Sequence, residues 1–281
     1  MSSTVFIFVI LAALLHAVWN ALIKGSKDQR LNMTALALGG IPISLIVLFF
    51  QPFPHQDSWV YILLSTLIHL VYLFTLLNSY KTGELSQVYP IARGSAPLMV
   101  AGVSFFLLNE VFNLNQTIAI ALIILGILIS TFAKQSTGKR NFSAAKLALF
   151  TGCTIAAYSI IDGIGGRLSG NALTYFACVA ISYGVVFPLL VERQTPGLIK
   201  RIPKEGKLAF FIGSNASIIA YTIVVWAFTQ APIALVTALR ETSISFALII
   251  GMLFLKERIT AFKFIAVGLT LMGAIMLKLV S

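Results

Sequence analysis

The sequence has few charged residues and very few acidic ones. Only 10% of its 281 residues are charged, nine are Asp or Glu and 20 are Lys or Arg, whereas 58% are hydrophobic and the mean hydropathy is +0.95. A soluble domain of this length needs a far more polar surface to cover its core. The composition therefore excludes a soluble globular protein and indicates a chain surrounded mainly by lipid.

Cysteine and histidine are also scarce. Cys153 and Cys178 both fall inside long apolar runs, so no disulfide framework is expected. The three histidines, His16, His55 and His69, do not have the spacing of metal ligands, and neither an H-E-x-x-H motif nor a nucleotide-binding G-x-x-x-x-G-K-[ST] loop occurs. We therefore expect no cofactor, no metal and no catalytic residues, which disfavours an enzyme or an ATP-driven pump.

Long apolar runs make up most of the chain. A helix needs about 20 apolar residues to cross the hydrocarbon layer, and these runs have that length and are separated by short polar connectors. They predict an all-α integral membrane protein with ten transmembrane helices. The expected spans are 4–23, 31–50, 58–80, 85–107, 114–133, 144–166, 171–191, 206–229, 233–254 and 260–280.

Basic residues are distributed unevenly between two sets of connectors. The connectors between spans 1 and 2, 3 and 4, 5 and 6, 7 and 8, and 9 and 10 hold 16 of the 20 Lys and Arg, whereas only Arg167 and Lys278 belong to the other side. No aromatic platform is interleaved with them, so no nucleic-acid partner is expected. The positive-inside rule predicts a multi-pass protein of the bacterial inner membrane, with both termini outside the cytoplasm.

The two halves of the chain repeat each other. When residue i is set beside residue i+147, the matched pairs include Arg93 with Arg240, Glu110 with Glu257, and Gly126 with Gly273. Paired Arg and paired Glu at one shared offset are hard to obtain by chance. Both glutamates fall in connectors at span ends, where helix capping and interfacial ion pairing are the favoured interpretation.

The repeat predicts two domains of five spans each, residues 1–140 and 141–281. Because five is odd, the second half enters the membrane from the opposite side to the first. The sequence thus predicts two inverted five-helix repeats, a recurrent architecture of secondary transporters.

Each half also carries a helix with proline, a short acidic turn and a final helix with a glycine at mid-span. The turns are LLNEVFNLNQ in the first half and FLKERITAFK in the second. Over the whole chain this pattern resembles the EamA family of the drug/metabolite transporter superfamily. The segments YPIARGSAP (89–97) and TALRETSISF (237–246) further resemble a subgroup associated with phosphonate utilisation. The resemblance implies a central cavity lined by spans 1, 3, 4, 6, 8 and 9, with spans 5 and 10 to the side.

Two arginines lie deep inside expected spans. Arg93 is in the fourth span and Arg240 in the ninth. An Arg near the centre of the bilayer costs at least about 2.5–3.5 kcal/mol, so both must face a cavity or a partner. In one interpretation the two guanidiniums bind a carboxylate, phosphate or phosphonate of the substrate. In the other they form buried ion pairs, with Glu241 or Asp162 as the carboxylate.

Glu241 directly follows Arg240, so on a helix the two side chains point about 100° apart and are not expected to pair well. Glu241 could instead contact Arg93 across the cavity, or carry a proton that couples transport. Both alternatives remain open at this point.

Other polar side chains share helix faces. His16 and Asn20 lie on one face of the first span, and an offset of 142 places Tyr158 and Asp162 opposite them. His16 is a candidate proton carrier or a packing residue, and aromatic residues of the third and eighth spans are candidates for the cavity lining. The expected substrate-binding residues are Arg93, Arg240, Glu241, His16, Asn20, Tyr72, Tyr158, Asp162, Tyr221 and Trp226.

Together these features predict a secondary transporter that moves a small polar, anionic or zwitterionic metabolite, such as an amino acid or a phosphonate, by alternating access. Its expected partners are this small-molecule substrate, membrane lipid and, as a candidate coupling ion, the proton. The alternatives are a passive channel, a lipid-handling membrane protein and, least favoured, a membrane-embedded enzyme. The sequence leaves the direction of transport and the oligomeric state open.

Overall fold

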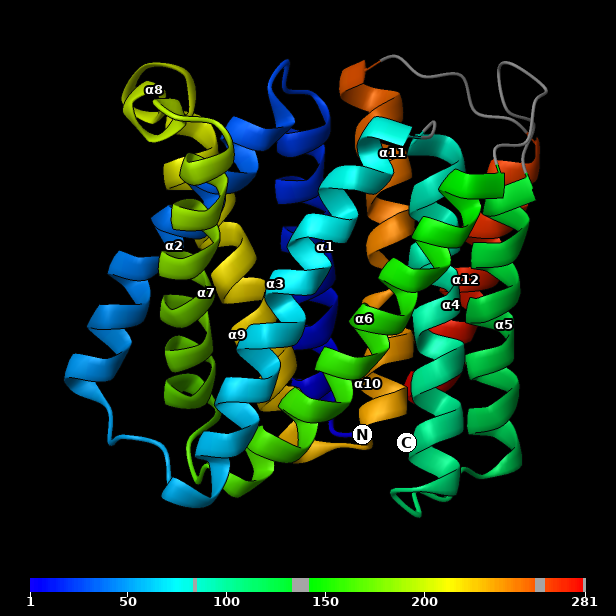
Figure 1. The fold of residues 1–281 in the computed structure, drawn as a ribbon. Helices are drawn as coiled ribbons and strands as arrows, with labels where there is room; N and C mark the ends of the chain where they lie inside the picture. Colours follow the sequence, from blue (N-terminus) through cyan, green and yellow to red (C-terminus); the bar gives the residue numbers. More distant parts are fainter. Residues whose placement is uncertain (83–84, 133–141, 256–260, 280–281) are drawn as a thin grey trace.

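The computed structural model describes residues 1–82, 85–132, 142–255 and 261–279, and every regular element in these ranges is helical (Figure 1). The elements of the first half are α1 (Ser3–Lys24), α2 (Gln29–Phe50), η1 (Gln56–Ser58), α3 (Trp59–Thr82), α4 (Leu85–Phe106) and α5 (Leu114–Phe132). Those of the second half are α6 (Phe142–Leu168), α7 (Ala172–Gln194), α8 (Leu198–Glu205), η2 (Ala209–Gly213), α9 (Ser214–Gln230), α10 (Ile233–Arg240), α11 (Ser243–Leu255) and α12 (Ala261–Leu279).

Most of these helices have the length and composition of membrane spans. Within the described residues, seven helical stretches are long and apolar enough to cross a membrane: Ser3–Ile23, Gln29–Phe50, Gln56–Asn78, Lys146–Leu168, Ala172–Gln194, Ala209–Gln230 and Ile233–Ile250. Shorter apolar helices cover Ile91–Phe106, Leu114–Ile129 and Phe264–Leu279. The all-helical membrane architecture is confirmed, while the number of ten crossings stays a prediction.

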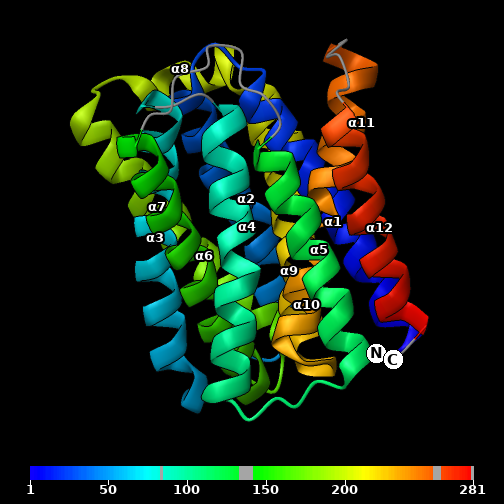
Figure 2. The same cartoon turned by 90° about the vertical axis from the view of Figure 1, so that its right-hand side faces the viewer.

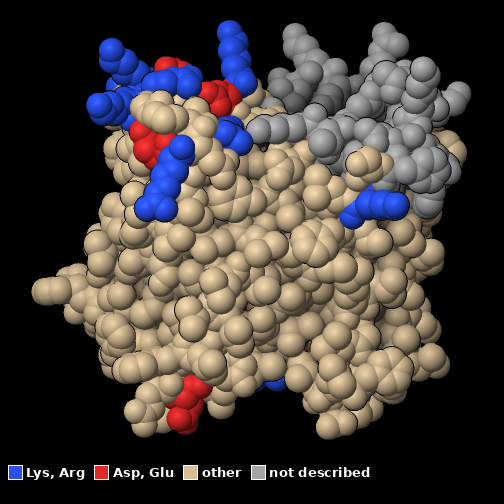
Figure 3. All heavy atoms as spheres, viewed as in Figure 1, with Lys and Arg blue, Asp and Glu red and all other residues tan. Residues whose placement is uncertain are grey.

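The two ends of the bundle differ in charge. The chain termini and the α4–α5 connection lie at one end, which we call the termini face (Figure 1). The α1–α2 turn and α8 lie at the other end, and Lys and Arg side chains gather there (Figure 3). The exposed cations of this basic face include Lys27, Arg193, Lys200, Arg201, Lys204 and Lys207. The positive-inside rule uses this uneven distribution of Lys and Arg to predict that the basic face lies in the cytoplasm.

Helix packing follows a twofold pattern that matches the sequence repeat. α2 packs against α7 and α5 against α12, each helix against its counterpart in the other half. α3 and α4 of the first half pack against α6, the first helix of the second half. In the same way, their counterparts α9, α10 and α11 pack against α1, the first helix of the first half. The first half starts at the termini face and the second half starts at the basic face (Figure 1). The repeat therefore appears in space as two halves that run in opposite directions.

α5 and α12 lie side by side (Figure 2), and two glycines related by the offset of 147 lie at their contact. A Cβ atom at Gly126 would lie 2.7 Å from the carbonyl oxygen of Ala266 and 2.5 Å from Oγ1 of Thr270. A Cβ atom at Gly273 would lie 2.7 Å from the carbonyl oxygen of Ala119. Both contacts involve backbone atoms that cannot rotate away, so the pair requires the absence of a side chain.

We expect Gly126→Ala to destabilise the protein by roughly 1–3 kcal/mol, because the helices must separate to admit the methyl group. Gly268→Ala in α12 is the matched control, since a Cβ atom there meets nothing within 4 Å. It should be neutral or slightly stabilising. Thermal unfolding of the detergent-purified variants measures both, and equal melting temperatures would contradict the packing argument.

The ninth expected span, 233–254, is not one continuous helix. α10 ends at Arg240 and α11 begins at Ser243. In the break, the N–H of Glu241 donates to the carbonyl oxygen of Ala238 at 3.1 Å, and Oγ1 of Thr242 donates to that of Leu239 at 2.8 Å. These bonds reach back three residues instead of four, which interrupts the regular α-helix. The equivalent helix of the first half, α4, is unbroken.

Candidate functional site

Three charged side chains meet inside the bundle with almost no exposed surface. Arg93 of α4, Arg240 at the end of α10 and Glu241 in the break have exposed fractions of 3%, 1% and 0%. Oε2 of Glu241 lies 2.9 Å from Nε of Arg93, and Oε1 lies 3.5 Å from Nη2 of Arg240. One carboxylate thus bridges two guanidiniums, which leaves this charged triad with an excess positive charge.

The prediction that Arg240 and Glu241 would diverge is wrong, because their charged groups are 3.5 Å apart. That prediction assumed a continuous helix, whereas α10 ends at Arg240 and both side chains are long enough to turn toward each other. The contact between Glu241 and Arg93, one of the two alternatives from the sequence, is present.

Arg240 has an unusual environment for a buried cation. None of its three guanidinium nitrogens has a hydrogen-bond partner among the described residues. It lies 3.5 Å from the Glu241 oxygen, and the centroid of the Tyr221 ring lies 5.9 Å from its Cζ. Burying a charge whose donors are unpaired is costly, and a guanidinium carries five N–H donors. Arg240 therefore has hydrogen-bond donors that no acceptor among the described residues satisfies.

Arg93 has further contacts on both sides. Its Nη2 donates to Oγ of Ser243 at 3.0 Å, and its Nη1 lies 3.1 Å from Nε2 of His16. Nδ1 of His16 in turn faces the indole N–H of Trp19 at 3.2 Å. Both ring nitrogens of His16 thus face donors, although a neutral imidazole accepts at only one nitrogen and a protonated one at neither. This arrangement disfavours His16 as a proton carrier in this conformation.

Asp162 of α6 is bound by hydroxyl groups, and none of the arginines in the described part of the chain forms an ion pair with it. It is fully buried, its Oδ1 accepts from the hydroxyl of Tyr175 at 3.1 Å, and its Oδ2 accepts from that of Tyr221 at 2.8 Å. Tyr221 also places its ring beside Arg240. One tyrosine therefore connects the buried aspartate to the charged triad.

The aromatic rings around Asp162 pack against one another. His69 of α3 stacks on Tyr158 and on Tyr183, with ring centroids 4.3 Å and 5.4 Å apart. Tyr72 and Tyr221 both meet Tyr158 edge to face, at 5.4 Å and 5.5 Å. This aromatic cluster joins α3, α6, α7 and α9 and contacts the charged triad where the Tyr221 ring lies beside Arg240.

The structure thus brings together eight of the ten expected site residues, in two adjoining groups. The remaining two lie elsewhere: the side-chain amide of Asn20 donates to the carbonyl oxygen of His16 in its own helix at 2.8 Å, and Trp226 packs edge to face on Phe8 at 5.6 Å. Sequence reasoning missed Tyr175 and Ser243 as site residues. Ser243 could have been found, because it follows Arg240 by three residues, which in the continuous ninth span expected from the sequence is a position on the same face.

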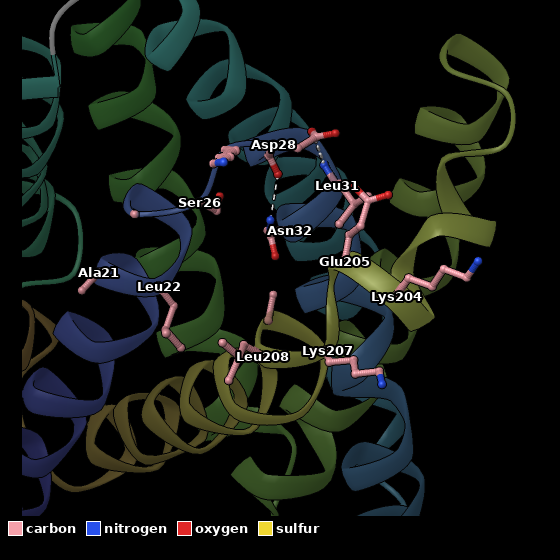
Figure 4. A pocket seen from close by; sticks show the side chains of 13 residues that line it. Ala21, Leu22, Ser26, Asp28, Leu31, Asn32, Lys204, Glu205, Lys207 and Leu208 are labelled. Atoms are coloured by element: carbon pink, nitrogen blue, oxygen red, sulfur yellow. Dashed lines mark hydrogen bonds between the residues drawn. The ribbon is translucent and has the colours of Figure 1, made fainter.

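A cavity of about 710 Å³ opens at the basic face between the two halves. Its walls come from the end of α1, the start of α2, α8 and η2, and Figure 4 shows the Asn32 and Leu208 side chains pointing toward it while the ends of Lys204 and Lys207 extend away. Its two acidic residues are paired with Arg201, which lies 3.0 Å from Asp28 and 2.6 Å from Glu205.

Arg201 also affects the acidity of its neighbour. Hydrogen bonds from its guanidinium lower the pKa of the Glu205 carboxyl below its ordinary value, so Glu205 stays ionised and paired at neutral pH. The cavity is therefore lined by two acids paired with Arg201, by three lysines, and by polar and apolar side chains.

At the termini face the two halves are tied together. The N–H of His55 donates to the carbonyl oxygen of Ser169 at 2.9 Å. Oε1 of Glu110 accepts from the N–H of Ile233 at 3.0 Å and lies 3.1 Å from Nη2 of Arg167. Glu110 therefore caps a helix and forms an ion pair, as its position in the sequence suggested. Its counterpart Glu257 lies outside the described residues.

The comparisons with known proteins agree with this architecture. No curated protein matches the sequence. Among solved structures 29 chains match, and one of them, titled only as the crystal structure of a protein, has a TM-score of 0.73 at 14% identity over 100% of this chain and 98% of its own. At that identity the likeness establishes the fold alone.

The family comparison is more informative. The model of the EamA-like transporter family matches residues 3–132 and 142–279, one segment in each half of the chain. The match does not extend to the phosphonate-associated subgroup. Nearly the whole sequence is covered, and the protein therefore belongs to the EamA-like transporter family, whose members are membrane transporters of the drug/metabolite transporter superfamily.

Proposed function

We propose that this transporter is a secondary carrier that moves a small anionic or zwitterionic metabolite by alternating access, with Arg240 as the main contact for the anionic group. The observation that carries the proposal is the buried guanidinium of Arg240, whose nitrogens have no hydrogen-bond partner among the described residues. A carboxylate or phosphonate would supply the missing acceptors in the forked geometry that a guanidinium favours.

The charge balance of the triad supports the same substrate class. Arg93 and Arg240 carry two positive charges and Glu241 one negative charge, all buried. Electrostatic interactions are stronger there than in water, so a bound monoanion that neutralises the triad is favoured and a bound cation is penalised. Phosphonates and the carboxylate of amino acids both meet this requirement.

Two further features favour alternating access over a permanently open path. The halves pack with a twofold pattern, as inverted repeats do, and such repeats allow two related conformations around a central site. The structure also has a cavity between the halves at the basic face, whereas contacts join the halves at the termini face. We infer that this conformation faces the basic side, which the distribution of Lys and Arg assigns to the cytoplasm.

The proton is a candidate coupling ion in this proposal, with Glu241 as its carrier. Protonation of Glu241 would release its contacts with Arg93 and Arg240, so that both guanidiniums become free for a substrate anion. A pH gradient across proteoliposomes should then alter the rate of uptake, and a rate that is independent of the gradient would remove this part of the proposal.

A counterflow experiment tests the carrier. Ligands are first chosen by thermal shift of the purified protein with alanine, 2-aminoethylphosphonate, methylphosphonate and uncharged acetamide, because a ligand of the folded state raises the melting temperature. Uptake of the labelled hit into proteoliposomes should accelerate when the same unlabelled compound is inside. Uptake that is indifferent to internal solute would indicate a channel, and stabilisation by acetamide alone would exclude the anionic substrate class.

A further inference from the structure

Four elements meet at one set of contacts on the termini face. Glu110, between α4 and α5, accepts from the N–H groups of Ile233 at 3.0 Å and Ala234 at 3.5 Å. Arg167 of α6 contacts Glu110 at 3.1 Å and donates to the carbonyl oxygens of Phe228 at 2.9 Å and Ala231 at 3.2 Å. We call these contacts the clasp. Glu110 belongs to the first half and every other member belongs to the second.

The clasp holds the start of α10, which has no cap of its own. Its N-cap residue is Pro232, whose side chain makes no capping bond. The carboxylate of Glu110 satisfies N–H groups of the first turn and lies at the positive end of the helix dipole. The side chain of Glu110 is 9% exposed and that of Arg167 38%, so one member of the pair is accessible to water.

α10 lies between two interruptions of the chain. Ala231 and Pro232 are extended before it, and the break at Glu241 and Thr242 follows it. All eight of its residues are buried, and at 1.5 Å per residue the helix is about 12 Å long. Its first turn is bound by Glu110 and its last residue is Arg240. A short helix with a break at each end can shift as a unit, so a displacement of its first turn would reach Arg240.

We propose that Glu110 and Arg167 are positioning residues, which hold α10, and through it Arg240, in the arrangement that is closed at the termini face. The inference rests on the proposed carrier. Because the clasp joins the two halves, the halves cannot separate at this face until the Glu110 carboxylate leaves Arg167 and the first turn of α10. Loss of the clasp therefore shifts the population toward the conformation open at the termini face.

Two cysteine reporters in a Cys153→Ser, Cys178→Ser background test this shift in proteoliposomes. Ala234→Cys lies in the first turn of α10 and is buried, and Asn32→Cys lines the cavity of the basic face. We expect Glu110→Gln to raise the maleimide labelling rate of the Ala234→Cys reporter roughly tenfold, the effect of losing one charge-assisted contact. Labelling of the Asn32→Cys reporter should fall at the same time.

Asp57→Asn is the matched control, since Asp57 is an exposed carboxylate that pairs with His55 and belongs to η1, in the connection between α2 and α3 that lies at the termini face (Figure 1). It should change neither reporter. Faster labelling of both reporters in Glu110→Gln would mean a loosened structure, and unchanged labelling of both would mean that the clasp does not position α10. Either result overturns the proposal.

Arg167→Gln provides a second variant in case Glu110→Gln does not fold. It removes the ion pair but leaves Glu110 free to cap α10, so a smaller shift in the same direction is expected, and its absence would also overturn the proposal. The labelling rates require no substrate. If the labelling rates change as expected but the protein shows no counterflow, the proposed carrier function is therefore refuted, and the proposed role of the clasp is not.

Discussion

Arg240→Gln is expected to weaken anion binding strongly without destabilising the protein. The substitution removes the guanidinium whose nitrogens have no partner among the described residues and leaves Arg93 and Glu241 as a neutral ion pair. Loss of a charge-assisted contact with the substrate should weaken binding roughly 10- to 100-fold or more. The melting temperature should stay equal or rise, because a buried charge without acceptors is costly in the folded state.

The measurement combines thermal unfolding with ligand titration for the wild type and Arg240→Gln. Arg193→Gln is the matched control, because Arg193 is an exposed arginine in the last turn of α7 that does not line the cavity and should leave ligand affinity unchanged. If Arg240→Gln binds the ligand as tightly as the wild type, the anion contact lies elsewhere. If its melting temperature falls sharply, Arg240 has a structural role that its contacts do not reveal.

Glu241→Gln is expected to have the largest effect on stability of any single substitution in the site. It leaves two buried arginines without the carboxylate that lies 2.9 Å from one and 3.5 Å from the other. Removing one partner of a buried charged pair typically costs about 3–5 kcal/mol, because the remaining charge is uncompensated. Glu205→Gln on the exposed surface of α8 is the control and should cost well under about 1 kcal/mol.

The double variant Arg240→Gln, Glu241→Gln gives this prediction its sharpest test. It holds one buried arginine where Glu241→Gln holds two, so Arg240→Gln should raise the melting temperature more in the Glu241→Gln background than in the wild type. An equal change in both backgrounds would show that Arg240 and Glu241 do not interact, since the effects of uncoupled sites add. In that case the bridging position of Glu241 would have no energetic importance.

The sequence alone was sufficient for the membrane class, the repeat and the deep position of the two arginines. Hydropathy is a sum over neighbouring residues, so it can be calculated from the sequence. The repeat is found by comparing the chain with itself at an offset of 147. The same offset relates Gly126 to Gly273 at the packed crossing of α5 and α12. These properties depend on local composition, so no knowledge of helix contacts was needed.

The partners of the buried charges were decided only by the tertiary structure. Arg93 meets His16 across 77 residues of sequence and Ser243 across 150, and Glu110 meets Ile233 across 123. The break in the ninth span was equally hidden, because its bonds depend on how Glu241 and Thr242 are held between packed helices. Hydropathy is averaged over many residues, so it does not reveal a break of two residues. The separation of two residues along the chain also does not determine their distance in space. The helix packing alone assigned Glu241 to both arginines, Asp162 to the tyrosines and Glu110 to the start of α10.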